Sequence, residues 1–184
     1  MIPDYQNIML PLLRYAGDRK EHSLREAIAT LANEFKLTEA ERKQLLPSGQ
    51  QTVFDNRVGW ARTYLKKSGL LAAPKRGFFQ ITEVGLQVLR QSPPKIDLNF
   101  LTQFPEFIKF KNNRKEIEDT KTEIEENWDK TPQESIEFGY QKICQELEIE
   151  LLNRIKTCSA EFFEKLVVDL LVKMGYGGSR RDAG

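Results

Sequence analysis

Residues 50–82 constrain the fold more than any other stretch, because they combine a long helix with a hairpin. Apolar residues recur there at spacings of four, three and four positions, which places them on one buried helical face: Phe54, Val58, Ala61 and Leu65. Ser68-Gly69 is typical of a helix C-terminus. Residues 70–72 and 78–81 then predict two short strands, joined by a turn at residues 74–77.

The outward face of this helix and the tip of the hairpin are basic. Between residues 50 and 81, six Lys and Arg side chains stand against the one carboxylate of Asp55. This arrangement is typical of a winged helix-turn-helix, whose helix enters the major groove while the hairpin contacts the flanking backbone. We predict binding to double-stranded DNA, because both basic groups lie on adjoining elements; the alternative is a solvated helix beside an ordinary turn. The expected contact residues are Asn56, Arg57, Arg62, Thr63, Lys66, Lys67, Lys75 and Arg76.

Two features of the long helix have more than one explanation. Gly59 costs roughly 1 kcal/mol in a helix interior, which indicates either a closely crossing helix, the reading we favour, or the approach of DNA backbone. Trp60 and Tyr64 are expected to pack on the first helix or the hairpin, with stacking on nucleic acid as the alternative.

The surrounding residues predict the other helices of a winged-helix domain at residues 1–95. Amphipathic patterns indicate helices over residues 3–16, 23–35 and 82–92, with a short one at 38–46. Pro11 either kinks the first helix or marks the start of its regular part. Two capping boxes are expected, in which a hydroxyl caps the third amide and a glutamate reaches back: Ser23 with Glu26, and Thr38 with Glu41.

Charge divides the rest of the chain from this domain. Residues 1–92 carry 14 basic and 9 acidic side chains, whereas residues 93–150 carry 8 and 14. We read residues 96–131 as a connecting segment, whose aromatic first part packs on the winged helix. The polar composition of residues 112–131 suits a linker or a solvated helix.

From residue 132 the pattern is helical again. Thr131-Pro132 is a good helix start, and Ser159 predicts the cap of a last helix to about residue 174. An apolar stripe follows the first of these helices: Ile136, Tyr140, Ile143, Leu147, Leu151 and Ile155. Such a stripe needs a partner, either the last helix or a second chain, and we expect a homodimer through residues 132–174. With no strand after them, residues 132–184 look like the helical opening of an incomplete domain.

Composition argues against several classes of protein. With only Cys144 and Cys158 there is no disulfide framework, and the lone His22 argues against a zinc site, so we predict no cofactor. Polar residues interrupt the apolar positions at the N-terminus, which argues against a signal peptide or a membrane span. We expect a cytoplasmic protein without a membrane partner.

Several runs resemble Mrr-type restriction proteins. The front part is similar to their N-terminal domain in IPDYQNIMLPLLRY, HSLREAI, FDNRVGWARTYLKKSGLL and KRGFFQITEVGLQVL. The last part resembles the start of their catalytic domain in ELLNRIKTCSAEFFEKLVVDLLVKMGYGGSRRDAG. The likeness covers residues 1–95 and about 132–184, and rests on non-periodic identities such as PLL, DNRVGWA, FFEKLV and MGYGG.

The resemblance implies restriction of modified DNA by a winged helix joined to an α/β nuclease of the PD-(D/E)xK type. That nuclease would hold Mg²⁺ through residues in a GDGGIDG-like run and a QxK-like run, and neither run occurs in this sequence. Only Glu164 can be carried over as a remnant of the active site. We therefore expect a chain that binds DNA without cutting it, with a winged-helix transcription regulator or a dimerising interaction module as the alternatives.

Overall fold

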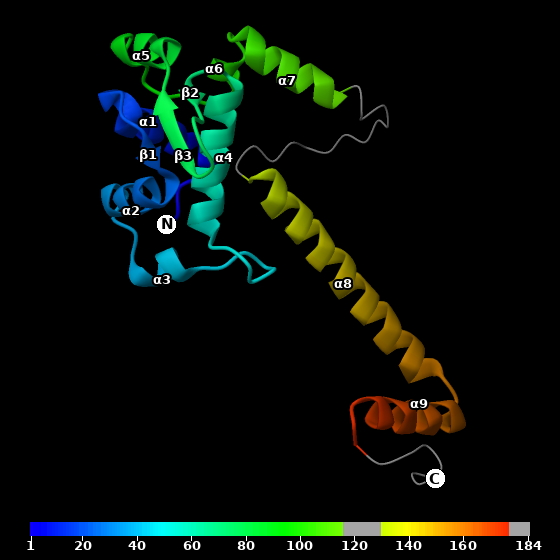
Figure 1. Ribbon diagram of the computed structural model, residues 1–184. Coiled ribbons are helices and arrows are strands. Elements are labelled where there is room, and N and C mark those ends of the chain that lie inside the picture. Colours follow the sequence, from blue (N-terminus) through cyan, green and yellow to red (C-terminus); the bar gives the residue numbers. More distant parts are fainter. Residues whose placement is uncertain (116–129, 177–184) are drawn as a thin grey trace. The chain divides into compact units, whose positions relative to one another are not determined.

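The computed structural model describes residues 1–115 and 130–176, and it separates into two compact units, residues 1–137 and the chain from Phe138 on (Figure 1). The elements of the first unit are α1 (Tyr5–Tyr15), a 3₁₀ turn η1 (Ala16–Asp18), β1 (His22–Ser23), α2 (Leu24–Glu34), α3 (Glu39–Lys43), α4 (Val53–Lys67), β2 (Leu71–Ala72), β3 (Phe78–Ile81), α5 (Glu83–Arg90), α6 (Leu98–Leu101) and α7 (Pro105–Lys115). The predicted mainly α, winged-helix-like fold is confirmed.

A small antiparallel sheet with strand order β1-β3-β2 forms the wing. Strand β3 pairs on one side with β1, where His22 lies opposite Phe79, and on the other with β2, where Leu71 lies opposite Ile81. The hairpin of β2 and β3 was predicted. Strand β1 was not predicted, because a strand of two residues is too short to show an alternation of apolar and polar side chains.

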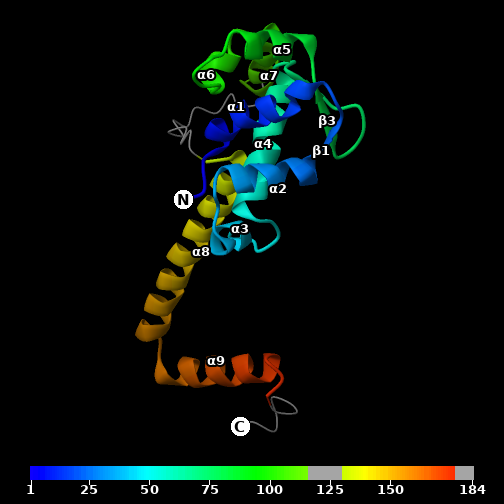
Figure 2. The ribbon, with the colours of Figure 1, turned by 90° about the vertical axis from the view of Figure 1, so that its left-hand side faces the viewer.

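Helix α4 runs through the middle of the first unit, packed against α1, α2 and β2 (Figures 1 and 2). Its predicted apolar face is buried: Phe54, Val58, Ala61 and Leu65 are each at most 1% exposed. Tyr64 stacks on Tyr5 of α1 with ring centroids 5.5 Å apart, which confirms its predicted packing on the first helix. Pro11 lies inside α1, which continues through it.

The helix starts show which capping predictions were correct. Thr38 and Glu41 form the predicted capping box, and the Thr52 hydroxyl caps α4 by accepting from the amide of Asp55. The capping box predicted at Ser23 is wrong, because the Ser23 side chain makes no capping hydrogen bond. Ser23 instead pairs with Phe78 in the sheet, and the neighbouring Leu24 amide donates to the Gly77 carbonyl at 2.9 Å.

The aromatic segment after α5 packs on the winged helix as expected, and it forms the helices α6 and α7. Phe107 is 4% exposed and lies edge-on to Tyr64, with centroids 6.1 Å apart. The ammonium group of Lys67 lies 4.9 Å from the ring centroid of Phe110. The linker predicted for residues 112–131 falls mostly on residues 116–129, outside the described part of the chain.

Helix α5 approaches the end of α4 closely at one glycine. A Cβ added at Gly85 would lie 2.3 Å from the Leu70 carbonyl oxygen and 2.7 Å from the Ile81 side chain. Only glycine allows α5 to sit this close to the backbone between α4 and β2.

The second unit consists of α8 (Pro132–Thr157) from Phe138 on, and of α9 (Ala160–Lys173), which Ser159 caps as predicted. Many of its apolar side chains are exposed; Tyr140 and Ile143 are 69% and 65% exposed, and Phe162 and Leu170 of α9 are 55% and 56% exposed. Within the described residues α9 therefore does not cover the α8 stripe, and a second chain stays a prediction. Across residues 1–115 and 130–176, no helix is both long and apolar enough to cross a membrane.

Candidate nucleic-acid interface

The C-terminal half of α4 presents the predicted basic residues at the surface. Lys66 and Lys67 are exposed in the last turn, and Arg62 and Thr63 are half-buried one turn earlier. The Thr63 hydroxyl donates to the Gly59 carbonyl at 2.9 Å, so its proton is already used within the helix. This part of the helix offers three cations on one short stretch.

The hairpin tip adds a second basic group. Lys75 and Arg76 are exposed between β2 and β3, and Gly77 closes the turn with φ of +81°. Lys75 lies 2.9 Å from Glu21 and 4.0 Å from the Phe78 ring centroid. Both partners of this ion pair are about half exposed, so it is worth little and a phosphate can replace it. Because β2 packs on α4, the two basic groups belong to neighbouring elements.

Asn56 and Arg57, also predicted to contact DNA, are covered by residues 131–134, which we call the docking segment. Asn56 was expected to face outward but is 3% exposed, and the Arg57 side chain is 17% exposed. The Arg57 guanidinium donates to Glu134 at 2.8 Å and to the carbonyls of Ile2 and Pro3, each at 3.0 Å. Arg57 therefore joins α4 to the N-terminus and to the start of α8.

The docking segment is held by the same groups that cap α8. The Thr131 hydroxyl accepts from the Glu134 amide at 3.1 Å and donates to Asn56 Oδ1 at 2.7 Å, and Thr131 is fully buried. Asn56 Nδ2 donates to Gln133 at 2.7 Å and to Gln51 at 3.3 Å. Thr131 was predicted as a cap, but its contact with α4 was not predicted.

A further anchor lies one turn along α8. The carboxylate of Glu137 accepts from the Ser48 amide at 2.8 Å and from the Ser48 hydroxyl at 3.0 Å. The hydrogen bond from the Ser48 amide, followed by those from Gln133 and the Ser48 hydroxyl, lowers the pKa of Glu137 despite partial desolvation. The start of α8 is thus bonded both to α4 and to the loop before it.

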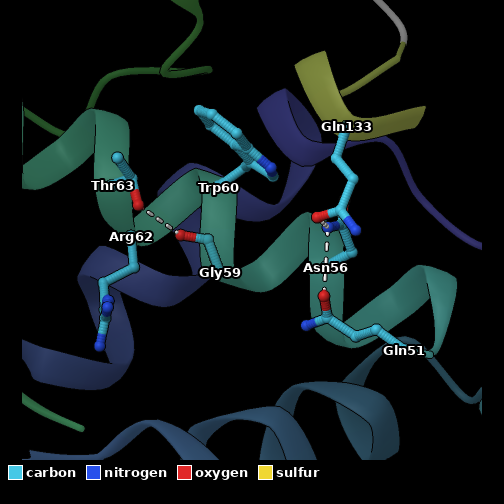
Figure 3. A pocket seen from close by; sticks show the side chains of 7 residues that line it. All are labelled: Gln51, Asn56, Gly59, Trp60, Arg62, Thr63 and Gln133. Atoms are coloured by element: carbon cyan, nitrogen blue, oxygen red, sulfur yellow. Dashed lines mark hydrogen bonds between the residues drawn. The ribbon is translucent and has the colours of Figure 1, made fainter. Parts of the chain in front are cut away.

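A shallow depression of about 220 Å³ lies on the exposed side of α4, next to the docking segment. Figure 3 shows its lining residues: Gln51, Asn56, Gly59, Trp60, Arg62, Thr63 and Gln133. A Cβ added at Gly59 would meet nothing within 4 Å, so the favoured explanation of Gly59, a closely crossing helix, is wrong. The Arg62 Nε is buried and has no hydrogen-bond partner among the described residues.

The described residues do not fit a metal site. Nowhere in residues 1–115 and 130–176 do three or more His, Cys, Asp or Glu side chains come together so that they could hold an ion. Glu164, the residue carried over as an active-site remnant, is exposed on α9. Mg²⁺ therefore enters no step proposed below, and the expectation that the chain carries no cofactor stays a prediction.

Residues 5–91, from the first turn of α1 to the end of α5, match the Mrr N-terminal domain family. The matched residues make up a little under half of the chain. Over 98% of its length it is also 28% identical to the type IV methyl-directed restriction enzyme EcoKMrr of Escherichia coli K12. The chain spans 62% of that relative's length, and no solved structure matches it. The predicted resemblance to Mrr-type restriction proteins is confirmed, and the docking segment lies outside the matched Mrr domain.

Proposed function

We propose that this chain binds double-stranded DNA through α4 and the β2–β3 hairpin, as the recognition part of an Mrr-type restriction protein. One observation carries the proposal: Lys66 and Lys67 on α4 and Lys75 and Arg76 on the adjoining hairpin are all exposed. Neither Lys66 nor Arg76 takes part in an ion pair within the described residues. Such cations gain most from a polyanion, because bound counterions are released from the DNA.

The arrangement suits one helix in the major groove with a hairpin on the flanking phosphates. A helix of the width of α4 fits the major groove, and the hairpin cations would lie over the backbone beside it. Phosphate contacts would supply most of the affinity but no sequence information. The relative is a methyl-directed enzyme. We therefore propose that this chain prefers DNA carrying a modified base. We further propose that the described residues contribute recognition, because nowhere in residues 1–115 and 130–176 do three His, Cys, Asp or Glu side chains come together to hold the metal ion that cleavage would use.

The experiment is a titration of a labelled duplex, followed by fluorescence anisotropy, over a series of salt concentrations. Neutralising about four phosphates should give a slope near −3.6 in log K against log salt. Lys66→Glu/Lys67→Glu and Lys75→Glu/Arg76→Glu should each lower the affinity and reduce the slope to about half.

The control is Lys142→Glu/Lys173→Glu, which makes the same change of net charge at exposed positions of the second unit. It should leave both the affinity and the slope nearly unchanged. The proposal is ruled out if the affinity does not change with salt concentration, or if it stays the same in both charge-reversal variants of the first unit.

The exposed apolar faces of the second unit favour a second function, self-association. Ile143 and Leu147 on α8 are 65% and 51% exposed, which is unusual for side chains at helical spacing. We propose that residues 132–174 form a homodimer. Sedimentation of the full chain should show a dimer that Ile143→Glu/Leu147→Glu converts to a monomer; a chain that is monomeric at all concentrations contradicts this.

A further inference from the structure

We propose that the depression over Gly59 takes the major-groove edge of one base pair, and that Gln133 of the docking segment completes it. The site that reads bases would then extend beyond the Mrr N-terminal domain, which ends at residue 91. This inference rests on the proposed DNA binding. It names the residues that would distinguish one duplex sequence from another.

The first argument is that Gly59 has no packing role within the described residues. A helix-interior glycine is less favourable than alanine, so its presence calls for a reason. At Gly85 the reason is visible, since a Cβ would collide with the Leu70 carbonyl oxygen. At Gly59 a Cβ would meet nothing within 4 Å, and the bare backbone instead faces the depression (Figure 3). No other described part of this unit fills the space beside Gly59, so a ligand can enter it.

The second argument is the chemistry of the lining. Side-chain amides and guanidinium groups are the groups that read base edges in the major groove, and an apolar wall suits a methyl group on a base. Gln51 and Gln133, which carry side-chain amides, line the depression together with Arg62 and Trp60. The Arg62 Nε is itself buried, so Arg62 would contact a base through the other nitrogens of its guanidinium group.

Asn56 is a positioning residue in this site. Both of its Nδ2 protons are used, one by Gln51 and one by Gln133, and its Oδ1 accepts from Thr131. The two glutamine side chains are thereby held on the same depression by one amide. A substituent that projects from a base into the major groove would occupy the space that Gly59 leaves empty.

The experiment compares Gly59→Ala with Gly139→Ala in the full chain. Both glycines lie inside helices, and a Cβ at either would meet nothing within 4 Å. The probes are a randomised duplex library and the same library made with 5-methylcytosine or with N6-methyladenine. Preference is measured as the affinity for the best duplex over that for the bulk, and stability by thermal unfolding.

We expect Gly59→Ala to raise the melting temperature by about 4 °C and to reduce the preference about tenfold or more. The slope against salt should stay that of the unaltered chain, because the phosphate contacts remain. Gln133→Ala should cause the same loss of preference, whereas Gly139→Ala and Gln141→Ala, an exposed glutamine of α8, should cause none.

The outcomes separate this inference from the proposed function. If the unaltered chain binds no duplex, the proposed function fails and the inference fails with it. If the chain binds with a steep salt slope but without preference, or if Gly59→Ala keeps the preference, only the inference is overturned. A lower melting temperature for Gly59→Ala would show a packing role for the glycine and would also overturn it.

Discussion

Arg57 and Glu134 should be coupled far more strongly than an ordinary surface ion pair. Their side chains are 17% and 11% exposed, and the guanidinium donates to Glu134 Oε1 from Nη2 at 2.8 Å and from Nε at 3.1 Å. Charge-assisted hydrogen bonds of this kind contribute about 1.5–3 kcal/mol, whereas exposed pairs contribute about 0–1 kcal/mol. We therefore predict a coupling free energy of about 2 kcal/mol.

The measurement is a double-mutant cycle by urea unfolding with Arg57→Ala, Glu134→Ala and both together. Each single change also removes other bonds, from Arg57 to the Ile2 and Pro3 carbonyls and from Glu134 to the Thr131 amide. Those losses occur in both arms of the cycle and cancel, so the remainder reports the pair itself.

The matched control is the pair of Arg154 and Glu150 on α8. Its atoms are closer, at 2.6 Å, but its side chains are 75% and 58% exposed, so its coupling should be about 0.5 kcal/mol or less. If the Arg57 cycle gives no more than this control, burial does not strengthen the pair. The docking segment would then not be fixed on α4 in the way argued above.

Three further changes test other contacts. Gly85→Ala should cost about 3 kcal/mol or more in unfolding free energy, because its Cβ would lie 2.3 Å from the Leu70 carbonyl oxygen; unchanged urea unfolding would contradict this. Thr131→Val should cost about 1–3 kcal/mol, because it leaves Asn56 Oδ1 without its donor, and hydrogen exchange at residues 130–137 should rise with it. The amino terminus, followed by the capping-box bonds from Thr38, lowers the pKa of Glu41 from 4.5 to about 2. Its stabilisation should therefore be complete above pH 4.5 and disappear as the pH falls towards 2; a difference between the unaltered chain and Glu41→Gln that does not shrink over this range would refute the assignment.

Local patterns predicted the framework of the first unit, because its central elements are set by near neighbours. The face of α4 follows from the spacing of Phe54, Val58, Ala61 and Leu65, and the Thr38 capping box from a four-residue motif. The equivalent motif at Ser23 failed although its residues fit equally well. There the competitor was β3, more than fifty residues away, which engages Ser23 in the sheet.

The contact of the docking segment with α4 could not be predicted, because it too joins residues that lie far apart in the sequence. Thr131 and Glu134 were recognisable as a helix start, since their bonds span three residues. The bond from Thr131 to Asn56, in contrast, spans 75 residues, so no local pattern contains both partners. A one-dimensional pattern places Asn56 on the outer face of its helix and says nothing of what covers that face.

The docking segment changes which residues are available to DNA. Asn56 can form four hydrogen bonds in all, and three are already made inside the first unit, so it has little left for a base. The Arg57 guanidinium already donates to Glu134 and to two backbone carbonyls. The docking segment, which covers these two residues, also places Gln133 in the lining of the depression over Gly59. Changes in the first turn of α8 should therefore alter which duplex is preferred, whereas changes at Lys66 or Arg76 should alter how tightly all of them are bound.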